Sequence, residues 1–525
     1  MNLTNDKMKK IIQHTGFVIF ALHIAACSKD FEEPNLLTPA LNPVQPDANA
    51  GSWKPILLTS ASEIPVSAPI GTGSPDYIAQ INEVKSWQNK MTESDRKLVS
   101  YWSAGAVLRW NEIMRELVAK YNLPPYQNAD GTYPIPSANN PMAYPFFPFS
   151  NPPYAARAYA YVTAAQFDGL IAAHYYKDLY KRQAVYNFDQ RITPLINKSN
   201  LFSYPSEDAV VIGTTVELLK LLFPGEQDFI QSKAEEHRRA RLIAGVNIRD
   251  ELEAGEALGK AVALKYVQRA RTDRTGAAIG IVNGQDLWKE FEQAAIQRGE
   301  TPWISQEIPK RPPMLPYFGK VRPFLFDSLT VVRTLRPPAP PSTKSEAFKK
   351  ELDEVLYFSR NPSRERVKIV HKWGDGVGTY TPPGHWNAIA TENMIPLNLS
   401  EVRWARNLAL LNMSLMDAAI VCWDAKFTYY NPRPSQVNPE IKTLTGLPNF
   451  PAYISGHSTF SGAAATILAH LIPDKAILFN EMAMEASNSR IYGAIHYRSD
   501  CEVGLSVGKK VGNYAIQRAR TDGAN

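Results

Sequence analysis

Cysteine is scarce in this sequence, with three residues in a chain of 525. Three cysteines cannot form the disulfide framework that holds small secreted domains together, so the fold has to rest on a buried core. Long runs of lysine and arginine are also missing, and a net charge of +6 is small for this length, so we expect no nucleic-acid partner. The histidines lack His-x3-His spacing, which argues against a zinc ion held by protein ligands.

Long apolar segments are lacking as well once the first residues are passed. The best candidate for a membrane span, residues 407–423, is interrupted by Asn412 and Asp417 and is better interpreted as a buried helix. Hydrophobic residues make up 44% and charged residues 21% of the chain, which is typical of a globular protein and excludes wholesale disorder. We therefore expect a soluble body with one large core or two.

The N-terminus is of a different kind. Three lysines precede the apolar run GFVIFALHIAA, which is too short to span a bilayer, and Cys27 follows the small residues of IAAC. This pattern predicts a bacterial export signal over residues 1–26, and IAAC resembles the lipobox that signal peptidase II cleaves before a cysteine that is then acylated. The alternative is a plain secretory signal with a coincidental cysteine.

A lipidated Cys27 predicts a protein of the bacterial cell envelope, periplasmic or surface-facing, that is anchored to a membrane but otherwise soluble. Residues 27–80 are rich in Pro, Ser, Asn and Ala and carry little periodicity, so we interpret them as a tether. The two other cysteines, Cys422 and Cys501, can form a disulfide in that compartment, and the sequence leaves their pairing open. It also leaves open the oligomeric state.

The chain contains an internal duplication. When it is shifted by 249 positions, residues 204–273 align without a gap with residues 453–522, and 21 of the 70 pairs are identical. The same offset pairs Lys177 with Lys426. Two related halves are the natural interpretation.

Both halves have a helical pattern, because long runs carry apolar residues at three- and four-residue spacing and alternating strands are scarce. We therefore predict an all-α protein made of two related helical bundles, of which the second carries the functional site. The expected division is an N-terminal bundle over residues 81–310, a Pro-rich connection over 311–399 and a C-terminal bundle over 400–525.

The duplication serves as an internal control for the residues of the second half. The second half has Arg433, His457 and His496 where the first has Ala184, Asp208 and Asn247. A bundle of this kind therefore folds without these three side chains, which weakens a purely structural explanation for them.

Two motifs in the second half are candidates for an anion-binding site: one contains two cations, and the other contains the predicted start of a helix. In KFTYYNPRP, the prolines stop any helix, so Lys426 is expected near a helix end and Arg433 on a rigid loop. In PAYISGHSTFSG, a helix that begins near Ser455 would offer free N–H groups and a favourable dipole to a negative ligand, and Gly456 would let the ligand approach the backbone closely. His457, on the same turn, can give or take a proton. Each motif alone could equally be surface cations or a helix cap.

The third motif is SRIYGAIHYRSD. Arg490 and His496 are six residues apart, so they face one site only if the helix breaks near Gly493. His496 and Asp500 are four apart, and the carboxylate can hold the imidazole in one tautomer. The three motifs together fit a tetrahedral or trigonal-bipyramidal oxyanion, which is phosphate or vanadate.

The pattern K-x6-RP, SGH and SR-x5-H, in this order, resembles the superfamily that joins type-2 phosphatidic acid phosphatases, bacterial acid phosphatases and vanadium-dependent haloperoxidases. The resemblance covers about residues 400–515, and it departs from the usual pattern at Ile454, where the family has proline. It implies that the equatorial oxygens of the oxyanion are bound by Lys426, Arg433, Ser455, Gly456 and Arg490.

The same resemblance implies the roles of the two histidines. His496 would be the axial vanadium ligand in a peroxidase or the phosphorylated nucleophile in a phosphatase. His457 would assist peroxide binding in the first case and protonate the leaving oxygen in the second. Asp500 would orient His496.

Three features favour the haloperoxidase branch. The size and the duplication resemble the large haloperoxidases, and the membrane spans of the lipid phosphatases are lacking. Trp423 and Phe450 are similar to aromatic positions that line the halide side of the vanadate pocket, although they could be ordinary core residues.

We therefore predict a vanadate-dependent, haloperoxidase-like enzyme that oxidises halide with hydrogen peroxide. The alternative is a periplasmic acid phosphatase that hydrolyses phosphomonoesters through a phosphohistidine and needs no cofactor. A non-catalytic, lipid-anchored binding protein is disfavoured, because a decayed site would not keep both histidines and three cations.

Overall fold

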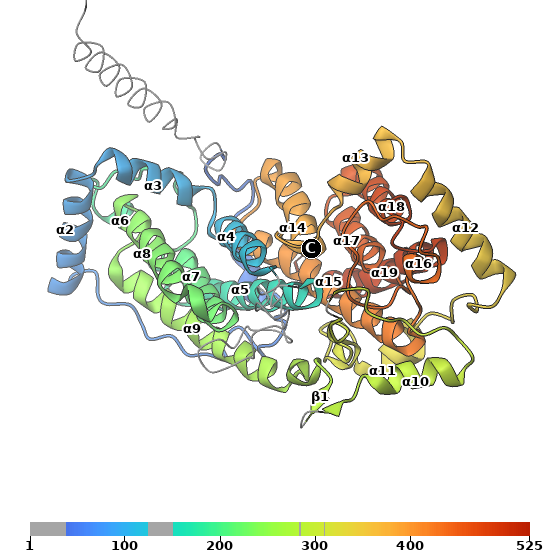
Figure 1. Cartoon of the computed structure of the whole chain (residues 1–525). Coiled ribbons are helices and arrows are strands. Elements are labelled where there is room, and N and C mark those ends of the chain that lie inside the picture. Colours follow the sequence, from blue (N-terminus) through green and yellow to red (C-terminus); the bar gives the residue numbers. More distant parts are fainter. Residues whose placement is uncertain (1–37, 124–150, 283–284, 309, 525) are drawn as a thin grey trace, which may run out of the picture. The chain divides into compact units, whose positions relative to one another are not determined.

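The computed structural model describes residues 38–123, 151–282, 285–308 and 310–524 (Figure 1). From Ala40 onward these residues belong to one compact unit, Ala40–Asn525. The predicted signal peptide over residues 1–26 and the predicted lipidation site Cys27 lie outside the described residues.

The described residues are mostly helical, as predicted for an all-α protein. The main helices of the first half are α2 (Pro75–Asn89), α3 (Glu93–Ser103), α4 (Ala106–Tyr121), α5 (Pro152–Tyr180), α6 (Val185–Phe188), α7 (Glu207–Leu222), α8 (Gln227–Ile243) and α9 (Arg249–Thr272). Those of the connection are α10 (Lys289–Gln297), α11 (Ser328–Thr330), α12 (Glu346–Arg360), α13 (Arg364–Lys372) and α14 (Thr381–Met394). Those of the second half are α15 (Glu401–Tyr429), α16 (Pro434–Val437), α17 (Gly456–Leu471), α18 (Ala476–Tyr492) and α19 (Arg498–Ala519).

Shorter elements complete the description. Single turns of helix are η2 (Ala48–Ser52), η3 (Pro224–Glu226), η4 (Thr275–Ala277), η5 (Phe318–Lys320), η6 (Val331–Leu335), η7 (Ile395–Leu397) and η8 (Pro473–Lys475). The strands of the described residues are β1 (Ile281–Val282) and β2 (Gln285–Asp286), which pair antiparallel.

The helices repeat with the offset seen in the sequence. The bounds of α15 to α18 equal those of α5 to α8 plus 249, and α19 begins 249 residues after α9. The local causes repeat too: Asn151 and Ser400 cap the N-termini of α5 and α15 through their side chains. Lys181 and Tyr430 end the same helices in left-handed backbone conformation.

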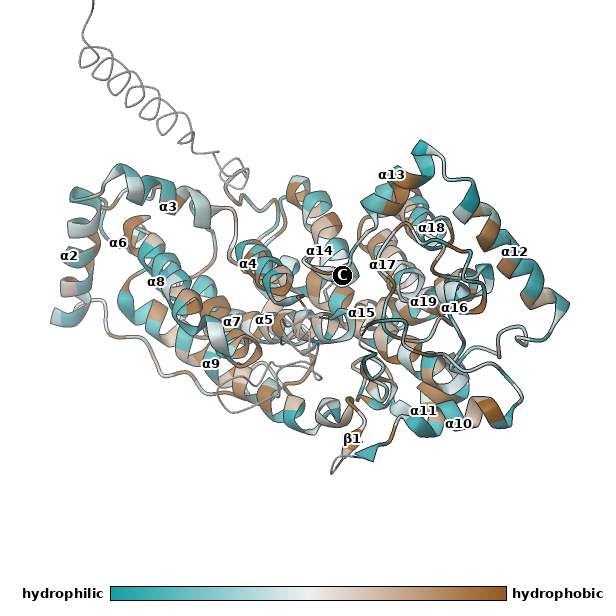
Figure 2. Cartoon of the chain, viewed as in Figure 1, coloured by the Kyte–Doolittle hydropathy of each residue, from teal (hydrophilic) through white to brown (hydrophobic). Residues whose placement is uncertain are grey.

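The core runs through both halves without interruption. Helices α5 and α15 pack against each other, and Figure 1 shows them side by side, with α7 and α9 packing on the first and α17 and α19 on the second. The colouring in Figure 2 shows mainly hydrophilic residues along the peripheral helix α2, which buries only three residues. Because the two halves share one core, the structure does not separate them into independent units, and the bounds 81–310, 311–399 and 400–525 stay a prediction from the sequence.

Two extended segments, residues 54–58 and residues 322–326, cross between the halves, and we call them straps. Residues 56–58 donate three backbone N–H bonds to the buried carboxylate of Asp168 on α5. Phe324 and Leu325 do the same for Asp417 on α15. The first residues of each strap are bound by an arginine of the opposite half. Arg518 donates to the carbonyls of Lys54 and Pro55. Arg269 donates to those of Arg322 and Pro323.

The first strap differs from the predicted tether over residues 27–80. From residue 40 on, this segment is folded: the side chains of Trp53 and Leu58 are 2% and 5% exposed. Its composition is poor in periodic apolar residues because it packs as an extended strap, held by backbone hydrogen bonds to Asp168 rather than by an apolar helix face.

Helix α15 is the segment that sequence analysis interpreted as a buried helix. By length and hydropathy the stretch Glu401–Val437 could cross a membrane, but 94% of its most apolar window is buried inside the protein. The predicted buried helix is thereby confirmed. Cys422 on this helix and Cys501 on α19 are both buried and free, so they do not form a disulfide.

Candidate active site

Lys426 lies in the last turn of α15, as predicted, and points into the second half. Its ammonium donates to the carbonyls of Pro451 at 2.8 Å and Ala452 at 3.0 Å. The loop that carries these carbonyls leads directly to Ser455. The isoleucine at 454 does not displace this serine, since the Ser455 N–H donates to the carbonyl of Asp500 at 2.9 Å, just as Ser206 donates to Glu251 in the first half.

His496 is held in one tautomer by its two neighbours. Its Nδ1 lies 2.9 Å from Asp500, and its Nε2 lies 3.0 Å from a guanidinium nitrogen of Arg433. Because arginine can only donate, Nε2 must be the acceptor and Nδ1 carries the proton that goes to Asp500. His496 therefore presents an unprotonated Nε2, which is the form that ligates a metal or attacks phosphorus.

Ser455 is the N-cap of α17, and its hydroxyl accepts the N–H of Ser458. The first turn of this helix, with Gly456 and His457, thus opens onto the same loop as Lys426. A Cβ at Gly456 would meet no atom closer than 3.9 Å, so packing does not demand a glycine here. A Cβ there would make only ordinary van der Waals contact with the rings of Phe460 and Trp423.

The helix break required between Arg490 and His496 is present. Helix α18 ends at Tyr492 and α19 begins at Arg498, so the two side chains leave different helices. Arg490 is 2% exposed, and it donates to Ser489 and to the carbonyl of Trp373. The charge of Arg490 contributes to the lowered pKa of His496, so the two side chains lie near each other.

An aspartate that the sequence did not single out supports His457. Asp375 lies 3.4 Å from His457 Nε2 through one carboxylate oxygen and 2.9 Å from His385 Nδ1 through the other. It comes 82 residues before His457, in the Gly-rich stretch KWGDGVG, without helical periodicity. Its one signal in the sequence is a histidine ten residues later, His385.

Burial dominates the electrostatics of this site. The side chains of Lys426 and Arg433 are 0% exposed. Burial, with the charge of Arg433, lowers the pKa of Lys426 to about 7, and burial lowers the pKa values of Arg433 and Arg490 to about 10. Burial and then these cations hold the pKa of His496 well below its usual value.

The carboxylates balance these charges only in part. Burial raises the pKa of Asp500 to about 7. Burial also opposes ionisation of Asp375, but His385 and His457 hold its pKa below the usual range, so Asp375 supplies one negative charge near Arg490. Among the described residues, one guanidinium nitrogen of Arg433, Nη2, is buried without a hydrogen-bond partner. An anionic ligand with several oxygens would satisfy both the charge and this donor.

The two predicted pocket aromatics are in place. Trp423 and Phe450 pack at 5.1 Å between ring centroids, and the indole N–H of Trp423 donates to the carbonyl of Met314. The ring of Phe450 lies 4.7 Å from the ammonium of Lys426 and 5.1 Å from the guanidinium of Arg433. The aromatic pair thus covers one side of the cations.

Comparison with known proteins agrees with this geometry. The PAP2 superfamily matches residues 407–522, so the second half contains a PAP2 superfamily domain. Over the larger part of the chain, solved structures of vanadium-dependent haloperoxidases share the fold.

One similar structure is the first bacterial vanadium-dependent iodoperoxidase, at 20% identity, with 78% of this chain and 96% of that chain covered and a TM-score of 0.57. A bacterial vanadium-dependent chloroperoxidase is similar in its apo form, at 14% identity, 70% and 94% coverage and a TM-score of 0.50. Its holo form gives 13% identity, 70% and 92% coverage and a TM-score of 0.51. None of the curated proteins matches the chain.

Proposed function

We propose that this protein is a vanadate-dependent haloperoxidase that acts on small molecules. The net reaction consumes halide, hydrogen peroxide and a proton and yields hypohalous acid and water. The observation that carries the proposal is a set of three buried cations that outnumber the ionised carboxylates around them, placed near the unprotonated Nε2 of His496. The likeness of fold to haloperoxidases over most of the chain supports this branch over a compact phosphatase.

The donor set fits vanadate. Lys426, Arg433 and Arg490 would hold its oxygens together with the N-terminus of α17, and His496 Nε2 would ligate it. The unpartnered Nη2 of Arg433 is an observation independent of any resemblance. Bound vanadate supplies a Lewis-acidic centre at which hydrogen peroxide becomes an oxidant for halide.

The residues of the chain set charge and protons around that centre. The three cations neutralise the oxyanion and withdraw electron density from it. Asp500 accepts a hydrogen bond from Nδ1–H of His496 and so keeps Nε2 unprotonated and free to ligate. The carboxylate of Asp375 lies 3.4 Å from Nε2 of His457, where its charge stabilises the imidazolium when His457 takes up a proton near the pocket.

A phosphomonoesterase is the second candidate, and the same tautomer of His496 favours it. An unprotonated Nε2 among three cations can attack a phosphate ester and form a phosphohistidine, while His457 protonates the leaving oxygen. No cofactor is needed in that case. The two proposals share the oxyanion site and differ in what lies beside it.

A paired assay on a soluble chain that starts after Cys27 tests the proposal. We expect halide oxidation by hydrogen peroxide that depends on added vanadate and is lost in His496→Ala. The matched control is Asn247→Ala, which changes the corresponding position of the first half and should leave turnover unchanged. Phosphatase activity that vanadate inhibits, with no halide oxidation, would assign the second function instead.

We also propose that the enzyme is a lipoprotein of the bacterial cell envelope, anchored through Cys27. The support is the signal-like N-terminus and IAAC. Metabolic labelling with a fatty-acid probe should mark the wild-type chain and not Cys27→Ala. Equal labelling of both chains would contradict the anchor and leave the oxyanion chemistry untouched.

A further inference from the structure

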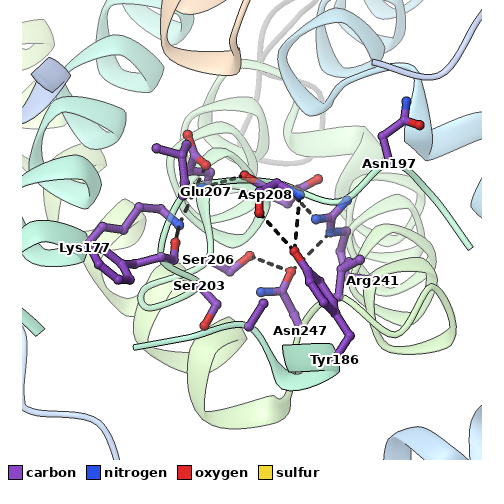
Figure 3. Close-up of a pocket in the computed structure, with 14 residues that line it drawn as sticks. Lys177, Tyr186, Asn197, Ser203, Ser206, Glu207, Asp208, Arg241 and Asn247 are labelled. Atoms are coloured by element: carbon purple, nitrogen blue, oxygen red, sulfur yellow. Dashed lines mark hydrogen bonds and ion pairs between the residues drawn. The ribbon is translucent and has the colours of Figure 1, made fainter. Parts of the chain in front are cut away.

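The first half has a cavity where the second half has its candidate active site. Its volume is about 60 Å³, which is room for a few water-sized groups. Lys177, Ser206 and Arg241 line it, and they correspond to Lys426, Ser455 and Arg490 at the offset of 249. Figure 3 shows these side chains around the N-terminus of α7.

The scaffold for an oxyanion is still built there. Ser206 caps α7 as Ser455 caps α17, and its N–H donates to the carbonyl of Glu251, the counterpart of Asp500. The ammonium of Lys177 donates to the carbonyl of Phe202, which corresponds to Pro451. Lys177 is buried, at 5% exposure, and Arg241 is half-buried, with 17% of its side chain exposed.

What differs is that each cation already has a carboxylate. Glu207 stands where the second half has Gly456, with one oxygen 3.7 Å from the Lys177 ammonium and the other 2.8 Å from His174. Asp208 stands where the second half has His457, and its oxygens lie 3.2 Å from Arg241 and 3.0 Å from His237. Figure 3 shows both carboxylates turned toward the cations.

We propose that the first-half pocket is a second oxyanion site that its own carboxylates, Glu207 and Asp208, keep closed. Two carboxylates on the first turn of α7 take the electrostatic place of one phosphate or vanadate ion. The wild-type chain therefore binds one inorganic oxyanion, in the second half only. The choice of oxyanion rests on the function proposed above, whereas the closure rests on the geometry of the first half.

The charge balance agrees with this assignment. Burial alone would raise the pKa of Glu207, but the charges of Lys177 and His174 lower it to about 2. Burial likewise opposes ionisation of Asp208, and Arg241 and His237 lower its pKa to about 2. Both carboxylates are therefore ionised at neutral pH and repel an incoming anion.

The test is the number of oxyanions bound. We would titrate the soluble chain that starts after Cys27 with tungstate in a calorimeter and compare the wild-type sequence with Glu207→Gln/Asp208→Asn. The wild type should bind one ion and the double variant two, because Lys177 and Arg241 lose their counter-charges. Glu217→Gln, which removes a carboxylate from the same helix outside the cavity, should keep the wild-type number.

The same titration in an Arg433→Ala/His496→Ala background separates this inference from the proposed function. There we expect no ion for the parent and one ion after the two carboxylates are neutralised. If the intact wild type binds no tungstate but the double variant gains one ion, the oxyanion site of the second half is wrong and the inference stands. An unchanged number in a double variant with a wild-type circular dichroism spectrum overturns the inference. Should that variant not fold, the single variants Glu207→Gln and Asp208→Asn decide in the same way.

Discussion

At the scale of single residues, the buried lysine of the site sets a pH dependence for anion binding. Burial lowers the pKa of Lys426 to about 7, so the free protein carries this charge below pH 7 and loses it above. An oxyanion needs the charge, and its affinity should therefore fall as the pH rises through about 7. Tungstate is a suitable probe because its own charge is constant near neutral pH.

The measurement is the tungstate dissociation constant on either side of that pH. In Lys426→Arg the fall should be much smaller, since a guanidinium stays protonated. Asp500, whose pKa burial raises to about 7, titrates in the same range and in the same direction, so Asp500→Asn removes its share. Equal affinities of the wild type at both pH values would contradict the prediction.

The pair of Asp375 and His457 gives a second prediction at this scale. Burial and Arg490 lower the pKa of His457 to about 4, and the carboxylate of Asp375 acts in the opposite direction. Removing that carboxylate in Asp375→Asn should lower the pKa of His457 further, by about one unit or more. The protonated imidazole then persists only at lower pH.

The pH profile of halide oxidation reports this change. Its acidic midpoint should move to lower pH in Asp375→Asn, and it should disappear in His457→Ala. A merely structural role of Asp375 would lower turnover at every pH and leave the midpoint where it is in the wild type.

At the scale of elements, close contact between α17 and α19 positions the serine cap and the histidine–aspartate pair. A Cβ on Gly508 would lie 2.2 Å from the carbonyl of Thr459, and one on Gly462 would lie 2.4 Å from that of Leu505. Gly508→Ala should therefore separate the helices and destabilise the protein by about 1–3 kcal/mol. Turnover should fall with it, because Ser455 on one helix and Asp500 on the other are joined by a hydrogen bond.

Urea unfolding and a tungstate titration check this prediction. Gly446→Ala is the matched control, since a Cβ there meets nothing within 4 Å. Loss of affinity without loss of stability in Gly508→Ala would show that the helix contact acts on the site by another route.

At this scale the long helices were predictable from the sequence and the straps were not. Periodicity, caps and the offset of 249 predicted the long helices and placed His457 at the start of one of them, because these signals are local. The strap at 54–58 was missed, although Lys-Pro-Ile-Leu-Leu resembles Arg-Pro-Phe-Leu-Phe at 322–326. That repeat has an offset of 268 instead of 249, and an extended strap bonded through its backbone leaves no helical pattern.

The site was predictable to the same degree. Residues within the three motifs came together because each motif is short and sits at a helix end. Asp375 was not predictable, since a loop 82 residues away meets His457 only through the tertiary fold. The closed state of the first-half pocket likewise depends on where the side chains of Glu207 and Asp208 point, which the alignment of the halves does not give.

At the scale of the whole molecule, the straps make each half depend on the other. The strap at 54–58 binds Asp168 of the first half through its N–H groups, and the carbonyls of Lys54 and Pro55 accept from Arg518 of the second. It contains no residue of the candidate site. Its removal should nevertheless weaken the second half, because it also buries Trp53 in the shared core.

We expect a chain that starts at residue 75 to lose at least about 3 kcal/mol of unfolding free energy relative to one that starts at residue 40, since burial of Trp53 and Leu58 alone is worth about that much. Urea unfolding followed by circular dichroism gives the difference. Arg518→Ala in the longer chain should reproduce part of the loss, whereas Arg520→Ala, whose residue is exposed, should not. If the shorter chain unfolds at the same urea concentration and binds tungstate equally well, the second half is an independent unit and the strap only covers its surface.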